Sequence, residues 1–331
     1  DIGFKYLGPV DGHDIKKLED ILERSKKIKG PVLIHVVTKK GKGYKLAEEN
    51  PDKFHGISAY NKETGETKRD KDYSKVFGNR LIELARKDEK IVAVTAAMRD
   101  GTGLKEFAEE FPDRFFDVGI AEQHALGLIA GMAKAGLKPV LPIYSSFLQR
   151  GYDQIVHDIA LSNIPVTVCI DRAGIVGNDG ETHQGLLDLS FLSSIPNVVV
   201  MAPKNFEELE KMLEFGLNLN KPVFIRYPRG GENYQFENTK NIEFGKAELI
   251  QEGTDLSLIA IGKMVGRAKE VANLLSEKSI EIINARFLKP LDKKTILKSI
   301  EKTGQVITLE DNLLKGGLGS AVIESVNNSR L

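Results

Sequence analysis

Hydrophobic residues recur along the chain with helical and strand spacing in alternation, a pattern that is typical of α/β proteins. Residues 14–28 repeat Ile and Leu on one face and predict an amphipathic helix. The continuous apolar run over residues 31–38 predicts a strand that follows this helix directly. Residues 39–71 are polar, rich in Lys, Gly and Asn, and without clear periodicity, so they predict a linker.

A second block of alternating elements begins near Asp72. Residues 73–88 predict a helix with one apolar face, and residues 91–97 predict a strand after it. Further runs rich in Val and Ile predict strands that are buried on both faces, and hence a mostly parallel sheet with right-handed crossovers. These runs are residues 139–144, 166–171, 197–202 and 223–228.

A third block follows the polar residues 229–245, which predict a second linker. Its apolar runs are residues 256–262, 280–287 and 305–311, with a helix expected over residues 265–277. We therefore expect an α/β protein. Its second block should form a mostly parallel sheet with helices on both faces, and its third block a smaller α/β domain.

Composition and charge narrow the class of protein. The 331 residues carry 47 basic and 47 acidic side chains, so no excess positive charge favours nucleic acid or an anionic membrane surface. No apolar run approaches the roughly 20 residues of a membrane span, and the first residues do not resemble a signal peptide. Cys169 is the only cysteine and lies in an apolar run, which excludes a disulfide framework and favours a cytoplasmic location.

Glu122 is the sharpest candidate for catalytic chemistry. It opens the stretch EQHALGLIAGMAK, whose small and apolar residues predict a buried helix. A buried carboxylate is costly unless it has a partner, although a first-turn carboxylate can also simply stabilise the helix dipole. Polar side chains in loops after two predicted strands favour the functional interpretation, because open α/β sheets bind ligands at such strand ends. These side chains are Tyr144, Arg150, Asp179 and His183.

Other motifs carry weaker signals. Arg229 also follows a predicted strand, and an arginine there suits either a phosphate or carboxylate contact or a structural ion pair. His13 lies in a glycine-rich polar loop, the kind of segment that places a side chain at a cleft. Residues 315–321, KGGLGSA, resemble a phosphate loop but favour a tight turn with close helix packing. No His or Cys cluster has the spacing of a zinc site, so we assign no metal ligands.

Five segments of the chain carry motifs of a known enzyme family. They read LGPVDGHD, GIAEQHA, IYSSFLQRGYDQ, IDRAGIVGNDGETHQG and RYPRGG. Together they resemble the 1-deoxy-D-xylulose-5-phosphate synthases, thiamine-diphosphate enzymes of the transketolase superfamily. The resemblance covers nearly the whole chain. The two longest segments, IYSSFLQRGYDQ and IDRAGIVGNDGETHQG, are far more specific to this family than the short AEQ element within GIAEQHA. It implies a transketolase-like pyrimidine-binding domain followed by a transketolase C-terminal domain.

The resemblance implies a transferase that condenses pyruvate with glyceraldehyde 3-phosphate, with loss of CO₂. The product, 1-deoxy-D-xylulose 5-phosphate, is a precursor of isoprenoids, thiamine and pyridoxal. Glu122 matches the glutamate that contacts N1′ of the cofactor's aminopyrimidine, so the partner of the buried carboxylate would be a ligand. Phe147 matches a ring that stacks on the pyrimidine. Arg150 and Arg229 match the pair of arginines that holds the acceptor's phosphate. Other polar groups that line the acceptor site match Tyr144, Asp179, His183 and His13, and the proton-transfer roles of these four are hypotheses.

The resemblance also implies a part that this sequence does not contain. Family members bind Mg²⁺ and the diphosphate through a GDG…N motif in a preceding domain, and no such motif with suitable spacing occurs here. We therefore expect the Mg²⁺ ligands outside this sequence and interpret the chain as a fragment that is inactive alone. The expected divisions are residues 1–50 (tail of the diphosphate-binding domain), 51–71 (linker), 72–228 (pyrimidine-binding domain), 229–245 (linker) and 246–331 (incomplete C-terminal domain).

The expected partners are the two substrates, a second copy in a homodimer and, as an open alternative, a second chain that carries the missing N-terminal part. Two other interpretations remain. One is the β-type subunit of a split transketolase or of a 2-oxo acid dehydrogenase, which residues 1–50 argue against because such a subunit would begin near Asp72. The other is a non-catalytic dimerising scaffold, which the joint presence of the candidate residues argues against.

Overall fold

The computed structural model describes residues 3–51, 53–55, 57, 59–66, 71–177, 179–237 and 239–329. The chain divides into two compact units, residues 1–69 and residues 70–331. Across the described ranges, no helix has the length and apolar character needed to cross a membrane.

The first unit holds a parallel two-stranded sheet, β1 (Lys5–Asp11) and β2 (Val32–Val37), whose strands are joined through helix α1 (Ile15–Lys26). The predicted helix and strand are confirmed, whereas β1 was not expected. The apolar face of α1 is not buried, since Ile15 and Leu22 are both exposed. One helix and two strands offer too little surface to cover that face.

The segment expected to be a plain linker contains local order. A short helix, α2 (Lys45–Glu49), lies within it. Three aromatic rings, those of Tyr44, Phe54 and Tyr60, meet with centroids 5.3 Å to 6.0 Å apart. Such edge and tilted contacts stabilise a small cluster. The rings are irregularly spaced along the chain, so no periodic pattern in the sequence revealed them.

The second unit is built on a seven-stranded sheet in the order β12-β7-β8-β6-β5-β3-β4. Six strands are parallel, which confirms the predicted sheet, and β12 pairs antiparallel with β7 at one edge. The strands are β3 (Ile91–Thr95), β4 (Phe115–Asp117), β5 (Lys138–Tyr144), β6 (Thr167–Asp171), β7 (Val199–Met201), β8 (Val223–Arg226) and β12 (Phe287–Lys289).

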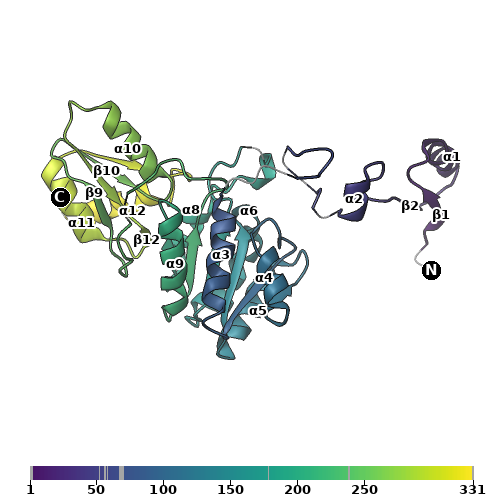
Figure 1. The fold of residues 1–331 in the computed structure, drawn as a ribbon, viewed down its shortest axis with the longest axis horizontal. Helices are drawn as coiled ribbons and strands as arrows, with labels where there is room; N and C mark the ends of the chain where they lie inside the picture. Colours follow the sequence, from purple (N-terminus) through teal and green to yellow (C-terminus); the bar gives the residue numbers. More distant parts are fainter. Residues whose placement is uncertain are drawn as a thin grey trace. The chain divides into compact units, whose positions relative to one another are not determined.

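Helices cover both faces of this sheet, because alternate residues of its strands point into two separate apolar clusters. One face is covered by α3 (Tyr73–Ala85), α4 (Lys105–Glu110) and α9 (Phe206–Asn218), with α3 and α9 side by side (Figure 1). The other is covered by α5 (Glu122–Lys134), α8 (Asp188–Ser194) and a helical run that includes α6 (Ser145–Leu148), α7 (Tyr152–Gln154) and the π-helix Ile155–Ala160.

The third block forms a four-stranded sheet in the order β13-β10-β11-β9, in which only β9 is antiparallel to its neighbour. The apolar run 280–287, expected to be one strand, supplies two. Arg286, with a left-handed φ of +56°, turns the chain between β11 and β12, so that the two strands join different sheets. The remaining elements are β9 (Glu248–Gln251), β10 (Leu256–Ala260), β11 (Ile280–Asn284), β13 (Val306–Leu309), α10 (Met264–Leu274), α11 (Lys293–Thr303) and α12 (Leu318–Ser329).

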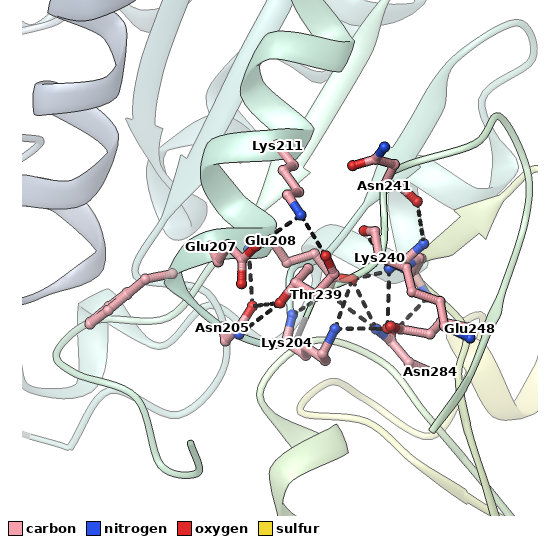
Figure 2. A network of polar contacts seen from close by, with 12 residues as sticks. Lys204, Asn205, Glu207, Glu208, Lys211, Thr239, Lys240, Asn241, Glu248 and Asn284 are labelled. Carbon is pink, nitrogen blue, oxygen red and sulfur yellow. Dashed lines mark hydrogen bonds and ion pairs between the residues drawn. The ribbon is translucent and has the colours of Figure 1, made fainter. Parts of the chain in front are cut away.

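A buried polar cluster joins the two sheets (Figure 2). Lys204 Nζ lies 2.7 Å from Glu248 Oε2 and 3.4 Å from Glu208 Oε1. Arg286 Nε donates to Glu208 at 2.7 Å, and Arg286 Nη2 lies 3.2 Å from Glu248. Asn284 donates to both carboxylates. Two positive and two negative charges are thus buried together, so the cluster is neutral as a whole.

The predicted second linker is held against this cluster. Arg286 donates to the backbone carbonyl oxygens of Lys240 and Asn241, at 3.0 Å and 2.9 Å. Thr239 exchanges hydrogen bonds with Asn205, which caps α9 (Figure 2). The polar residues after β8 are therefore a fixed connection at these positions.

Candidate active site

The candidate residues of the second unit gather at one edge of the seven-stranded sheet. Tyr144, Asp171 and Arg226 are the last residues of β5, β6 and β8. Because these strands are parallel, their carboxyl ends meet at the same edge, which is the usual ligand-binding edge of open α/β sheets. The segments that follow these strands carry Arg150 and His183, in short 3-10 helices, and Asp179 and Arg229, in loops.

Glu122 is the first residue of α5 and is 2% exposed. Its carboxylate has a protein partner, because Arg150 Nη1 lies 3.4 Å from Oε1 and 3.3 Å from Oε2. These distances exceed the roughly 2.7–2.9 Å of a strong charge-assisted hydrogen bond. The Arg150 side chain is itself 55% exposed. The pair therefore leaves the carboxylate with capacity for a better donor.

Three rings lie beside this pair. The Tyr144 and Phe147 rings stack at 5.6 Å between centroids, and the His183 ring meets Phe147 edge-on at 5.0 Å. The Arg150 guanidinium lies 6.0 Å from the Phe147 centroid. Burial raises the pKa of Tyr144 to about 12, so its hydroxyl stays protonated at neutral pH and can donate a hydrogen bond.

Asp179 connects two arginines, Arg229 and Arg172. Its carboxylate contacts the Arg229 guanidinium and lies 3.3 Å from Arg172 Nε. Arg172 in turn lies over the Tyr144 ring, 3.9 Å from the centroid. Together with Arg172, the seven candidate residues of this unit thus form one connected set, in which Arg150 and Arg229 each already have a carboxylate partner.

Arg172 is the residue of this set that sequence reasoning missed. It follows β6 directly and has a left-handed φ of +57°, a conformation that costs free energy in a non-glycine residue. It donates to the Gly101 carbonyl oxygen at 2.8 Å and lies 3.2 Å from Asp171. Burial raises the pKa of Asp171, against the opposing effect of Arg172 and of a 2.6 Å hydrogen bond from Ser74. The available signal for Arg172 was its position directly after a strand, since Arg150 and Arg229 also follow strands at a short distance.

His13 belongs to the first unit, where it forms hydrogen bonds with Asp11 and Lys39. Its ring Nε2 accepts a hydrogen bond from the Lys39 backbone N–H at 2.7 Å, and the backbone N–H of His13 donates to the Asp11 side chain at 2.9 Å. Accepting through Nε2 places the proton of a neutral ring on Nδ1. The loop after β1 thus holds this ring in a defined tautomer.

The glycine-rich segment before α12 is closed by an acidic side chain of its own domain. Glu310 accepts hydrogen bonds from the backbone N–H groups of Leu318 and Gly319, at 2.7 Å and 2.9 Å. A Cβ at Gly317 would lie 1.9 Å from the Glu310 carboxylate. The interpretation of these glycines as a tight turn with close packing is confirmed.

Three family models match consecutive parts of the chain. The 1-deoxy-D-xylulose-5-phosphate synthase model matches residues 1–38, and the transketolase pyrimidine-binding domain matches residues 69–233. The transketolase C-terminal domain matches residues 245–331. These matches agree with the fold class expected from the sequence.

Curated relatives carry the same family name. A 1-deoxy-D-xylulose-5-phosphate synthase of Clostridium perfringens (strain SM101 / Type A) is 54% identical over 334 residues, 99% of this chain and 54% of its own length. One of Halothermothrix orenii is 55% identical over 338 residues, 100% of this chain and 53% of its own length. The chain therefore spans about half the length of the curated relatives it matches.

Solved structures give the same fold. A split gene transketolase, described as an inactive beta4 tetramer, superposes with a TM-score of 0.72 at 30% identity, over 78% of this chain and 86% of that one. The transketolase of Campylobacter jejuni superposes with a TM-score of 0.64 over 97% of this chain and 65% of that one, and at 18% identity it shows the fold alone. The chain therefore belongs to the transketolase family and, within that family, is similar to the 1-deoxy-D-xylulose-5-phosphate synthases.

Proposed function

We propose that this chain supplies the pyrimidine-binding and acceptor-binding side of a thiamine-diphosphate-dependent transferase. The reaction is condensation of pyruvate with glyceraldehyde 3-phosphate, with loss of CO₂, to 1-deoxy-D-xylulose 5-phosphate. The observation that carries the proposal is a buried, weakly paired carboxylate, Glu122, that lies next to aromatic rings and arginines at one sheet edge. The names of the curated relatives support the choice of substrates.

The residues at this edge fit the aminopyrimidine end of the cofactor. Glu122 would hold a proton at N1′ of the ring, and burial strengthens such a hydrogen bond because the local dielectric is low. Phe147 would stack on the pyrimidine face. Thiamine diphosphate, when bound, supplies the electron sink for the reaction. The proposal places the Mg²⁺ ligands in the part of the relatives' length that this chain does not cover.

The acceptor side consists of two arginines and four polar side chains. Arg150 and Arg229 would hold the phosphate of glyceraldehyde 3-phosphate, since guanidinium groups suit bidentate contact with phosphate. Each arginine contacts a carboxylate in the free protein, that of Glu122 and that of Asp179. Binding of the phosphate would exchange one anion for another at each arginine. The proposal adds Tyr144, Asp179, His183 and His13 as groups that bind the acceptor or move protons.

The reaction is tested by combining this chain with the part of the Clostridium perfringens relative that the alignment leaves uncovered. We expect the assembled protein, with thiamine diphosphate and Mg²⁺, to convert the two substrates to the product with release of CO₂. The 331-residue chain alone should show no turnover. Turnover by the chain alone would contradict the fragment interpretation, and an assembled protein that binds the cofactor without making the product would contradict the reaction.

His183→Ala provides a residue-level test. The His183 ring contacts Phe147 and lies in the loop after β6, and its Nδ1 is 2.8 Å from Thr182 Oγ1. If the ring moves a proton in the reaction, turnover should fall by roughly 10²-fold or more, while cofactor affinity stays unchanged. His157→Ala is a suitable control, because that histidine is largely exposed on the π-helix. Unchanged kinetics of His183→Ala would remove it from the mechanism.

The domain divisions, a homodimer and a cytoplasmic location belong to this proposal as well. The alternative of a β-type subunit has one observation in its favour, the 30% identity to a split gene transketolase. The match of residues 1–38 to the synthase model favours the synthase instead. Release of CO₂ separates the synthase from a split transketolase, which transfers a two-carbon unit between sugars without decarboxylation. Formation of 1-deoxy-D-xylulose 5-phosphate separates it from a 2-oxo acid dehydrogenase, which also releases CO₂.

A further inference from the structure

The loop that carries Asp179 and His183 is closed at its base by backbone hydrogen bonds. Gly174 and Gly185 exchange two of them, at 2.7 Å and 2.8 Å. Inside the loop, Gln184 accepts from the Val176 N–H at 2.8 Å and donates to the Gly180 carbonyl oxygen at 2.7 Å. A loop closed in this way moves as a unit, so whatever fixes its base also fixes the side chains it carries.

One carboxylate of the C-terminal domain lies against this base. Both oxygens of Asp311 accept from the Ile175 backbone N–H, each at 3.2 Å. A Cβ at Gly174 would lie only 1.9 Å from Asp311 Oδ2, so the carboxylate occupies the space that a side chain would take. The Asp311 side chain is 10% exposed and forms an ion pair with Lys263 of the same domain.

The backbone around Asp311 holds the other end of the loop. Buried Arg226 donates to the carbonyl oxygen of Asp311 and also contacts the Gly185 carbonyl oxygen at 3.4 Å. The Leu313 N–H donates to the Leu186 carbonyl oxygen at 3.1 Å. Both ends of the loop are thus fixed by one segment, which follows β13 in the C-terminal domain.

We propose that Asp311 is a positioning residue for the acceptor side of the site. From the C-terminal domain it holds the base of the loop, so that Asp179 stays beside Arg172 and Arg229 until the phosphate replaces its carboxylate at Arg229. The inference depends on the proposed function, which assigns this loop to the aldehyde acceptor. It gives the C-terminal domain a direct part in acceptor binding.

Hydrogen exchange of the 331-residue chain tests the structural half. In Asp311→Ala, amide exchange over residues 175–184 should rise about 10-fold to 100-fold, the range expected when a hydrogen bond to a charged acceptor is lost. Asp311→Asn, whose amide oxygen can still accept from Ile175, should recover part of the protection. Asp311→Asn, which keeps the shape of the side chain, also serves if Asp311→Ala fails to fold, because exchange over residues 175–184 should still exceed that of the unsubstituted protein.

Asp255→Ala is the matched control. Asp255 also accepts from a backbone N–H, that of Ser279 at 2.8 Å, but it precedes β10 and so lies at the opposite end of the parallel β10–β13 pair from Asp311. Its loss should leave exchange over residues 175–184 unchanged. Unchanged loop exchange in Asp311→Ala would overturn the proposal.

Steady-state kinetics of the assembled protein test the functional half. Asp311→Ala should raise the KM for glyceraldehyde 3-phosphate about 10-fold, with the KM for pyruvate and the affinity for thiamine diphosphate unchanged. A merely structural residue would lower the active fraction, and hence kcat, without this split, and that result would overturn the proposal. If the unsubstituted assembly makes no product, the proposed function fails, and hydrogen exchange alone decides whether Asp311 holds the loop.

Discussion

Glu122→Gln is expected to lower the turnover of the assembled protein by about 10²-fold to 10⁴-fold, the usual contribution of a positioned acid or base. Glutamine keeps the shape of the side chain but cannot share a proton with a pyrimidine nitrogen. Cofactor affinity should fall as well, since a charge-assisted hydrogen bond becomes a neutral one. The measurements are the initial rate of product formation and calorimetric titration of thiamine diphosphate.

The same substitution should leave the free energy of unfolding unchanged or raise it. Glu122 is buried, its contact with Arg150 is long, and Arg150 is exposed enough to be hydrated when the carboxylate is gone. Glu106→Gln is the matched control, because Glu106 is a first-turn glutamate on an exposed part of α4. A loss of stability in Glu122→Gln, with turnover falling only in proportion to the folded fraction, would make Glu122 a structural residue instead.

Glu248→Gln is expected to cause the largest loss of stability, about 3–5 kcal/mol, the usual cost of removing one partner from a buried ion pair. Glu208 would then be the one carboxylate left in the cluster for both Lys204 and Arg286. Because these residues join the two sheets of the second unit, thermal unfolding should also become less cooperative. Differential scanning calorimetry measures both effects.

Two comparisons separate the charge effect from general disruption. Adding Lys204→Met to Glu248→Gln removes one charge of each sign, so the double variant should recover part of the lost stability. Glu252→Gln, an exposed carboxyl just after β9, should have little effect. A double variant no more stable than Glu248→Gln would show that the buried charge balance is not what matters.

The acid sensitivity of the protein should depend on the same cluster. Burial raises the pKa of Glu248, but the hydrogen bond and charge of Lys204 and the charge of Arg286 outweigh it, so the pKa lies below its ordinary value of 4.5. The stability that such a lowered pKa contributes is present above pH 4.5 and is lost as the pH falls through the lowered value. Glu248→Gln should therefore lose less stability on acidification than the unsubstituted protein. Parallel pH profiles for the two would exclude this contribution.

The candidate site was largely predictable because its residues follow strands. Tyr144, Arg150 and Arg229 each lie at or shortly after the carboxyl end of a strand, and in a parallel sheet such ends meet at one edge. The pairing of these residues was not predictable. The sequence offered no reason to place Arg150 on Glu122 or Arg229 on Asp179, because the first contact depends on how two helical segments pack and the second on loop conformation.

The alternation of apolar runs and amphipathic helices along this chain was enough to predict an α/β fold with a mostly parallel sheet. A helix buried on one face repeats its apolar residues every three to four positions, whereas a strand buried on both faces is apolar throughout. The alternation could not predict that the run 280–287 reaches two sheets, because no glycine or proline marks the turn at Arg286, whose side chain contacts two buried carboxylates. Nor could it predict that Asp311 reaches the loop after β6, or that four charges are buried together between the two sheets. Those features depend on residues far apart in sequence, and only folding brings them within hydrogen-bonding distance.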